Sequence, residues 1–380
     1  MADHLFSPIK LRDLELVNRI VVPPMGQHVC SDGNAADWHM MHLGQYAVCG
    51  AGLVIIEATA ISPGGRISPF SLGLYSDENE AALRRIVDFC RDIGQAPFGI
   101  QLDHSGRKGS REPSWGSRAQ IEIADGGWET VAPSAVPWAN NYPAPRALDE
   151  AGMDEIKEQF VAATRRSDNL GLDLIELHCA HGYLLHQFLS PITNHRDDAY
   201  GGSLEKRLAF PLEVFTAMRA AWPKHKPMGV RVSVTDWIDG GWDVESSVAF
   251  GTALKERGCD FIVASSGGIA PQQAIEAGPG YQVGFADQIK RETGLATMAI
   301  GLITEPLQAD TIVRSGQADM IALARGLMYN PRWPWHAAVA LGQHAPFPQP
   351  YWQSHPSMKA HASGQTVGKF EGPGAKGDGR

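Results

Sequence analysis

The chain has 380 residues, of which 43% are hydrophobic and 20% are charged, and its formal net charge is −9. This composition is typical of a water-soluble globular protein. The negative charge and the absence of a Lys/Arg block argue against nucleic acid and anionic membranes as partners. No apolar run is as long as a membrane span, and the first residues lack the pattern of a signal peptide.

The cysteines indicate a reducing compartment. They are widely spread and never paired as CxxC: Cys30, Cys49, Cys90, Cys179 and Cys259. Disulfides are rare in the cytosol, and iron–sulfur clusters need several closely spaced thiolates. We therefore expect a cytoplasmic protein with free thiols and no cysteine-bound cluster.

In chain order, short apolar segments alternate with amphipathic ones. Residues 5–19 predict a small hairpin that turns at Arg12-Asp13. Apolar segments predict eight strands, at residues 20–22, 53–58, 97–102, 172–177, 227–233, 260–265, 296–301 and 319–324. Amphipathic stretches predict a helix after each strand, near residues 37–49, 77–93, 153–169, 203–222, 245–257, 282–293, 305–315 and 331–342.

This alternation predicts the fold class. Near-continuous apolar strands separated by helices are typical of an α/β protein whose parallel sheet is covered on both faces. Eight such units predict a single (β/α)₈ TIM barrel over residues 1–360, and an open doubly wound sheet is the alternative. Residues 103–150 form a long loop excursion after the third strand, which predicts a lid or binding loop. The Gly-rich residues 361–380 predict a disordered tail.

The end of the fourth strand carries two histidines and a tyrosine. In a barrel, chemistry belongs to the loops at the carboxyl ends of the strands. His178 and His181 would face opposite sides of a continuing strand, so they converge only if the chain turns after His178, which Gly182 permits. Tyr183 follows directly. Two other readings stay open: structural histidines, and a zinc site that includes Cys179.

Other strand ends suggest a phosphorylated ligand. Barrels often bind phosphate between the loops after the seventh and eighth strands. Those loops begin with Gly301-Leu302 and with Ala324-Arg325-Gly326. Gly301 and Gly326 allow the backbone to approach an anion closely, and Arg325 can add positive charge. Gln101 and Arg231 end other strands and could hold a heterocycle. No GxGxxG or GxxxxGK[ST] pattern supports Rossmann NAD binding or P-loop chemistry.

Several stretches of the sequence resemble those of a known family. The matching stretches run in order over residues 5–352: Asn18-Arg-Ile, Pro24-Met25, Glu57-Ala-Thr-Ala, Gly99-Ile-Gln101-Leu, His104-Ser-Gly-Arg-Lys108, Trp128 to Ser134, Ile175 to Tyr183, Ser190-Pro, Asn194-His-Arg196, Tyr200-Gly-Gly-Ser203, Val230-Arg231-Val-Ser233 and Ala324-Arg325. The chain resembles the old yellow enzymes, which are FMN-dependent ene-reductases, and within them the bacterial branch of YqjM-like enzymes and xenobiotic reductases.

The resemblance implies a non-covalent FMN at the mouth of the barrel. The residues implied to line the isoalloxazine ring are Pro23, Pro24, Met25, Gly26, Ala58 and Gln101. Arg231 is implied to lie near N1 and the C2 carbonyl, where it stabilises the negative charge of reduced flavin. The phosphate is implied to bind at Gly301, Leu302, Ala324 and Arg325.

The resemblance also implies a reaction. NADPH or NADH donates hydride to the flavin, and the flavin passes it to the C=C bond of an α,β-unsaturated carbonyl compound such as an enone, enal or maleimide. His178 and His181 are implied to donate hydrogen bonds to the carbonyl oxygen, and Tyr183 to protonate the α carbon. His28 and Trp352 are implied substrate contacts, and a homodimer or homotetramer is the expected assembly. Nitro-compound reduction, oxidative demethylation and a metal-dependent barrel hydrolase using the histidine pair are the alternatives.

Gly26 and His28 depart from the pattern of this branch, where cysteine and tyrosine are common. We hypothesise that Gly26 leaves more room above the flavin and removes a sulfur contact, which changes the flavin potential and the substrate range. We expect His28 to titrate near neutrality and to make activity depend on pH. Trp352 lies where some relatives insert an arginine into the neighbouring subunit, so an aromatic finger from a partner subunit is plausible.

Overall fold

The computed structural model describes residues 3–113, 115–140 and 142–356. The predicted disordered tail, residues 361–380, lies outside these ranges. Within them, no helix is both long and apolar enough to cross a bilayer. The cysteines carry no disulfide and all five are buried.

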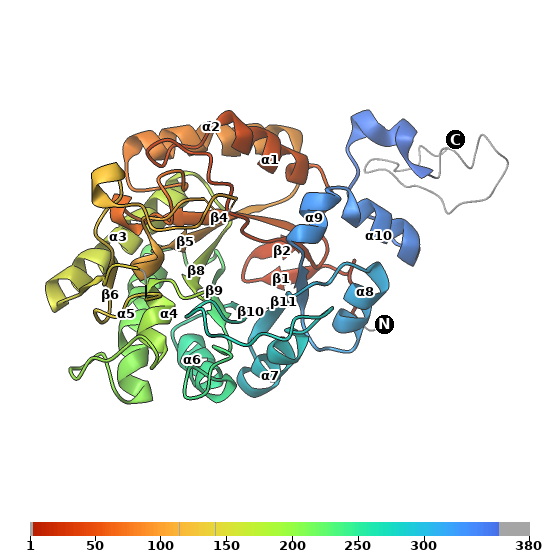
Figure 1. Cartoon of the computed structure of the whole chain (residues 1–380). Coiled ribbons are helices and arrows are strands. Elements are labelled where there is room, and N and C mark those ends of the chain that lie inside the picture. The colour runs from red at the N-terminus through yellow and green to blue at the C-terminus, as the bar shows by residue number, and fades with distance from the viewer. Residues whose placement is uncertain (1–2, 114, 141, 357–380) are drawn as a thin grey trace, which may run out of the picture.

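Eight parallel strands form a closed barrel (Figure 1). They are β3 (Ile20–Val22), β4 (Leu53–Ala60), β5 (Phe98–Asp103), β8 (Leu174–Cys179), β9 (Met228–Ser233), β10 (Phe261–Ser265), β11 (Ala296–Ala299) and β12 (Met320–Ala322). Each strand pairs with the next in chain order, and β12 pairs with β3 to close the ring. The barrel prediction is confirmed, and the alternative of an open doubly wound sheet is wrong.

Helices surround the barrel, as Figure 1 shows. The predicted ones are α1 (Asp37–Ala47), α2 (Asp77–Ile93), α3 (Glu150–Asn169), α5 (Leu204–Ala221), α6 (Val244–Glu256), α7 (Val283–Thr293), α8 (Pro306–Arg314) and α10 (Trp333–Leu341). Side chains of Ser76, Asp149 and Asp243 accept backbone N–H groups at the starts of α2, α3 and α6. The pattern does not predict α4 (Leu184–Leu189) and α9 (Arg325–Tyr329), because each is too short to show helical periodicity.

The barrel interior is filled by an apolar core at its amino-terminal end. Strand side chains alternate between this inner core and the outer layer under the helices. The inner core contains Val21, Leu53, Ile55, Leu174, Phe261, Val263, Met298 and Met320. The hairpin of β1 (Ile9–Leu11) and β2 (Leu14–Leu16) adds Leu11 and Leu16 to it. The predicted hairpin is therefore confirmed, and it covers the end of the barrel opposite the carboxyl rim.

The excursion after β5 contains short elements. These are the 3₁₀ turns η2 (Gly106–Lys108) and η3 (Ile123–Asp125) and a parallel pair of β6 (Val131–Ala132) with β7 (Arg146–Ala147). Arginine side chains hold the excursion through its backbone carbonyls. Arg107 donates to the carbonyls of Val136 and Pro137, and Arg196 donates to that of Pro133. The loop is therefore fixed at the carboxyl rim mainly through main-chain groups.

Leu174 tests the inner core, because it is fully buried at the start of the strand that leads to His178. We expect Leu174→Ala to lower the free energy of unfolding by about 2–5 kcal/mol, since the cavity cannot collapse in a closed barrel. The matched control is Leu307→Ala on α8, where the side chain is 69% exposed, and we expect a change within about 0.5 kcal/mol. Urea unfolding measures both, and equal losses would contradict this description of the core.

Candidate active site

The chain turns immediately after β8, as the sequence predicts. The strand ends at Cys179, and His181 and Gly182 adopt positive φ angles of 59° and 74°. This reversal brings His178 Nε2 within 3.2 Å of His181 Nδ1. The Tyr183 ring meets the His178 ring edge-on, with 5.0 Å between their centroids. The three side chains therefore form one cluster, and we call residues 180–183 the histidine–tyrosine turn.

Both histidines of the cluster are neutral at physiological pH. Burial lowers the pKa of His178 and His181 well below the usual range, and the Arg231 cation lowers them further. His178 Nδ1 accepts the N–H of Ala180 at 3.1 Å, so its proton is on Nε2. His181 Nε2 lies 2.7 Å from Ser265 Oγ. His178 Nε2 therefore donates to His181 Nδ1, which leaves the His181 proton on Nε2, where it can donate to the Ser265 hydroxyl.

A buried lysine lies next to the cluster. Lys108 Nζ is 5.2 Å from the centre of the Tyr183 ring and donates to the carbonyls of His181 and Gly268, at 2.6 and 2.9 Å. Burial lowers the pKa of Lys108 to about 7 and raises that of the Tyr183 phenol. Tyr183 therefore keeps its proton at neutral pH. Through these two hydrogen bonds Lys108 connects the histidine–tyrosine turn to the loop that follows β10.

A cavity of about 320 Å³ begins beside this cluster and reaches the loops after β11 and β12. This volume is in the range of small-molecule and cofactor sites. Its lining includes Pro23, His181, Arg231, Ser265, Ser266, Tyr281, Gln282, Gly301, Leu302, Thr304, Ala324, Arg325 and Gly326. Gly301 has a φ of 108°, and a Cβ there would lie 2.9 Å from Gln282 Nε2. The fold thus gathers the predicted phosphate residues around one cavity.

Buried polar side chains inside the barrel lie near Arg231, which lines the cavity. Gln101 Nε2 donates to Glu176 Oε1 at 2.6 Å, and both side chains are buried. Burial raises the pKa of Glu176 to about 7, against the opposing effects of Arg231 and Gln101. Within the described ranges, Glu176 Oε2 and Arg231 Nε have no hydrogen-bond partner. Because buried polar groups are normally paired, these atoms fit a polar heterocycle bound at the mouth.

The remaining predicted ring contacts come from the loop after β3 and from β4. Pro23 lines the cavity, and the Met25 side chain is buried in the larger hydrophobic core. Ala58 follows a bulge in β4 and pairs with Gln101. Gly26 lies beside Glu57, which accepts the N–H of Gln27 at 2.8 Å.

His28 fills the space that Gly26 leaves. A Cβ on Gly26 would lie 3.4 Å from His28 Nε2, and His28 Nδ1 is 2.8 Å from Ser68 Oγ. The ring of Trp115, in the excursion, meets His28 edge-on. Burial lowers the pKa of His28, against a smaller effect of Glu57. The expectation that His28 titrates near neutrality stays a prediction, and the structure adds that its pKa lies below the usual value because the ring is partly buried.

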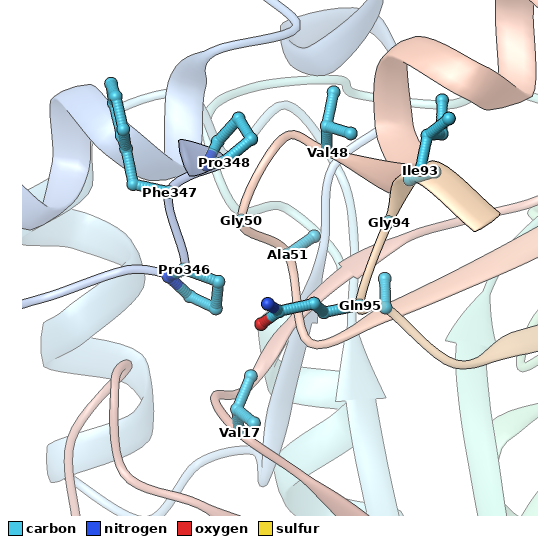
Figure 2. A pocket seen from close by; sticks show the side chains of 12 residues that line it. Val17, Val48, Gly50, Ala51, Ile93, Gly94, Gln95, Pro346, Phe347 and Pro348 are labelled. Carbon is cyan, nitrogen blue, oxygen red and sulfur yellow. The ribbon is translucent and has the colours of Figure 1, made fainter. Parts of the chain in front are cut away.

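Trp352 lies away from this rim in its own chain. It is in the 3₁₀ segment η4 (Gln349–Ser354), where its indole N–H donates to the carbonyl of Phe347. Phe347 lines a separate hollow near the amino-terminal ends of β3, β4 and β5 (Figure 2). Gly50 and Gly94 line the same hollow. A substrate contact from Trp352 thus requires a second copy of the chain, and it stays a prediction.

The geometry does not support the alternative of a zinc site that includes Cys179. The Cys179 side chain packs in the outer hydrophobic layer, on the opposite side of β8 from His178. Across the part of the chain that the structure describes, no group of three or more His, Cys, Asp or Glu side chains is arranged to hold a metal ion.

Several residues of the site are not singled out by sequence reasoning. Glu176 is a charged residue within a buried apolar strand, and such a residue indicates a polar site inside the barrel. Tyr281 and Gln282 reach the cavity from the long segment between β10 and α7, whose length is typical of binding loops. The contact of Lys108 with the histidine–tyrosine turn depends on tertiary packing, and no local pattern reveals it.

Comparisons with known proteins agree with this geometry. The chain matches the NADH:flavin oxidoreductase / NADH oxidase family over residues 4–343. It is 42% identical over 344 residues to the NADPH dehydrogenase of Geobacillus sp. (strain WCH70), and the aligned region covers 90% of this chain and 96% of that relative. It is also 42% identical over 349 residues to the NADPH dehydrogenase of Listeria monocytogenes serotype 4a (strain HCC23), covering 91% and 98%.

Solved structures show the same barrel. Morphinone reductase superposes with a TM-score of 0.75 at 27% identity, over 92% of each chain. The old yellow enzyme homologue from Zymomonas mobilis gives a TM-score of 0.74 at 24% identity, over 93% of this chain and 99% of that one, and so shares the fold. The resemblance found in the sequence is confirmed: the chain belongs to the NADH:flavin oxidoreductase / NADH oxidase family, which is the family of the old yellow enzymes.

Proposed function

We propose that this NAD(P)H-dependent flavin oxidoreductase uses FMN to reduce the C=C bond of α,β-unsaturated carbonyl compounds. Family membership and the NADPH dehydrogenase relatives support the flavin and the nicotinamide donor. The single observation that supports the substrate class is the convergence of His178 Nε2 and His181 Nδ1, 3.2 Å apart. A carbonyl oxygen bound here would accept the His178 Nε2 proton and, with the Ser265 hydroxyl turned to donate to His181 Nε2, the His181 Nδ1 proton as well.

The residues around the cavity fit FMN. The backbone of residues 301–302 and 324–325, with the Arg325 guanidinium, would hold the phosphate. Gln101 and Arg231 would meet the polar edge of the ring, where Arg231 Nε has no protein partner. Pro23, Pro24, Met25, Gly26 and Ala58 would lie along the ring. When bound, FMN takes hydride from NADPH or NADH and supplies it to the alkene.

The side chains of the chain itself would then carry out the polar part of the reaction. His178 and His181 would hold the carbonyl oxygen and stabilise the charge that grows on it during hydride transfer. Tyr183 keeps its proton because burial raises its pKa, and it lies against His178, so it can donate to the α carbon. The expected partners are therefore small activated alkenes, and a homodimer or homotetramer remains the predicted assembly.

The visible spectrum of the purified protein tests the whole proposal. We expect FMN absorbance that bleaches on anaerobic addition of NADPH or NADH and returns when 2-cyclohexenone is added. Recovery with a nitroarene but with no enone, enal or maleimide would replace the substrate class and keep the flavin. A protein that cannot be reconstituted with FMN would overturn the proposal.

Tyr183→Phe separates proton donation from binding. We expect kcat for 2-cyclohexenone to fall by about 10²–10⁴-fold, the usual contribution of a positioned general acid. Bleaching of the flavin by NADPH should continue, because that step needs no proton from Tyr183. Tyr200→Phe is the matched control, since Tyr200 lies in the loop before α5 and not in the cluster. Unchanged enone turnover in Tyr183→Phe would assign the proton to another donor.

Gly26→Ala and Gly26→Cys test the departure at this position. The added Cβ makes ordinary contact with His28 Nε2 and Glu57 Oε2, at 3.4 and 3.8 Å, so both variants should fold. We expect both to reduce turnover of bulky enones, because each adds atoms beside the site, and we expect only the longer cysteine side chain to displace the His28 ring. We expect the cysteine alone to change the flavin midpoint potential, because it adds a sulfur contact. Equal potentials and equal substrate ranges in all three proteins would contradict the hypothesis.

A further inference from the structure

We propose that His186 and Asp236 form a buried positioning pair that sets the geometry of the histidine–tyrosine turn by fixing one tautomer of His186. Neither residue belongs to the cluster that would touch substrate. His186 is on α4, immediately after the turn, and Asp236 is in the loop after β9. The proposal rests on the proposed function for its activity readout alone, because its central test concerns the tautomer.

The histidine–tyrosine turn is held by side chains at each of its central peptide groups. The His181 N–H donates to Ser233 Oγ at 2.9 Å, and the His181 carbonyl accepts Lys108 Nζ at 2.6 Å. The Gly182 N–H donates to His186 Nδ1 at 2.9 Å, and the Gly182 carbonyl accepts Gln187 Nε2 at 2.7 Å. These contacts come from three parts of the chain, namely η2, β9 and α4, so another peptide orientation would break several hydrogen bonds at once.

The turn needs such support because its backbone conformation is unfavourable. His181 has a φ of 59°, which a residue with a Cβ rarely adopts. The following residue must be glycine, since a Cβ on Gly182 would lie 2.1 Å from the carbonyl oxygen of Gly268. Rotation of the peptide group between His181 and Gly182 would move the His181 side chain and change the direction in which the chain continues to Tyr183. The orientation of this one peptide therefore controls both side chains.

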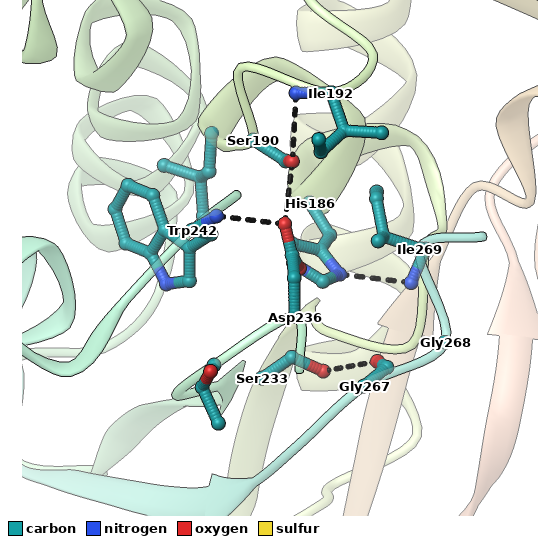
Figure 3. A network of polar contacts seen from close by, with 12 residues as sticks. His186, Ser190, Ile192, Ser233, Asp236, Trp242, Gly267, Gly268 and Ile269 are labelled. Atoms are coloured by element: carbon teal, nitrogen blue, oxygen red, sulfur yellow. Dashed lines mark hydrogen bonds and ion pairs between the residues drawn. The ribbon is translucent and has the colours of Figure 1, made fainter. Parts of the chain in front are cut away.

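Asp236 determines which nitrogen of His186 carries the proton. Asp236 Oδ1 lies 2.9 Å from His186 Nε2, at ion-pair distance without the alignment of an ideal hydrogen bond, and both side chains are fully buried. Neither atom has another protein partner in the ranges that the structure describes, so each is satisfied only by the other. Asp236 Oδ2 accepts Ser190 Oγ at 2.6 Å and the Trp242 N–H at 2.8 Å. Figure 3 shows Asp236 among His186, Ser190 and Trp242.

The directions of these hydrogen bonds leave one consistent assignment. His186 Nδ1 must be an acceptor because the Gly182 N–H points at it. The ring proton is then on Nε2, where it faces the carboxylate. Burial opposes ionisation of Asp236, but His186, Ser190 and the Trp242 N–H together lower its pKa, so it is a carboxylate at neutral pH. This carboxylate keeps the proton away from Nδ1 and leaves that nitrogen free for Gly182.

Asp236→Asn tests the assignment. The oxygen on the Oδ2 side is fixed by two donors, Ser190 and Trp242, so the new amide N–H₂ must face His186. A proton kept on His186 Nε2 would then face the amide N–H₂ of the new side chain. The proton therefore moves to Nδ1, where it faces the Gly182 N–H instead. We expect ¹⁵N-histidine NMR to show the tautomer reversed relative to the parent protein, and hydrogen exchange at Gly182 to become faster.

A pair of substitutions at His186 separates position from packing. The carbonyl oxygen of His186→Asn can take the place of Nδ1 and accept the Gly182 N–H. The longer side chain of His186→Gln places its amide near the former Nε2, which keeps Asp236 paired and leaves Gly182 unpaired. We expect kcat/KM for 2-cyclohexenone within about threefold of the parent for His186→Asn, and a loss of about 10²-fold for His186→Gln and Asp236→Asn, the usual effect of a small misplacement.

The outcomes distinguish this inference from the proposed function. Retention of the Nε2 proton in Asp236→Asn, with unchanged exchange at Gly182, would overturn the positioning pair. Equal kcat/KM in His186→Asn and His186→Gln would also overturn it, because packing alone would then explain the site. If the parent protein reduces no enone, the proposed function fails, and the tautomer and exchange measurements still decide the role of the pair. Flavin content and melting temperature serve as controls for folding.

Discussion

The parallel pairing of β12 with β3 closes the barrel, and every functional position depends on that closure. The pairing is short, with Ile321 opposite Ile20 and Ala322 opposite Val21. Closure turns a sheet with two edges into a ring, so the loops after all eight strands meet at one rim. It brings Pro23, at the end of the first barrel strand, next to Ala324 and Arg325, after the last.

The closed ring also sorts polar from apolar side chains. The inner face of the strands is apolar near the hairpin and polar near the rim, where Gln101, Glu176, His178 and Arg231 lie. In this dry interior the histidines are neutral, the tyrosine is protonated and Glu176 has a raised pKa, and burial is the largest cause in each case. The protonation states of these side chains are therefore consequences of where the strands end.

Much of this arrangement could be predicted from the sequence because it follows from periodicity and topology. Apolar segments show the strands, and the order of eight units places Gly301 and Arg325 at adjacent loops. The turn at Gly182 is predictable because only a reversal lets two histidines three residues apart converge. The rest depends on packing between distant segments. The folding of His28 over Gly26, the contact of Lys108 with His181 and the pairing of His186 with Asp236 join segments that no local pattern relates.

The way in which the excursion is attached affects how the enzyme can evolve. Arg107 donates hydrogen bonds to the carbonyls of Val136 and Pro137, and Arg196 donates to that of Pro133. Every amino acid has a backbone carbonyl, so these contacts do not depend on the side chains of the loop. Side chains such as Trp115, which face the site, can therefore drift under selection without detaching the loop. The residues that the excursion places beside the cavity can therefore change while the barrel and the attachment of the loop stay the same.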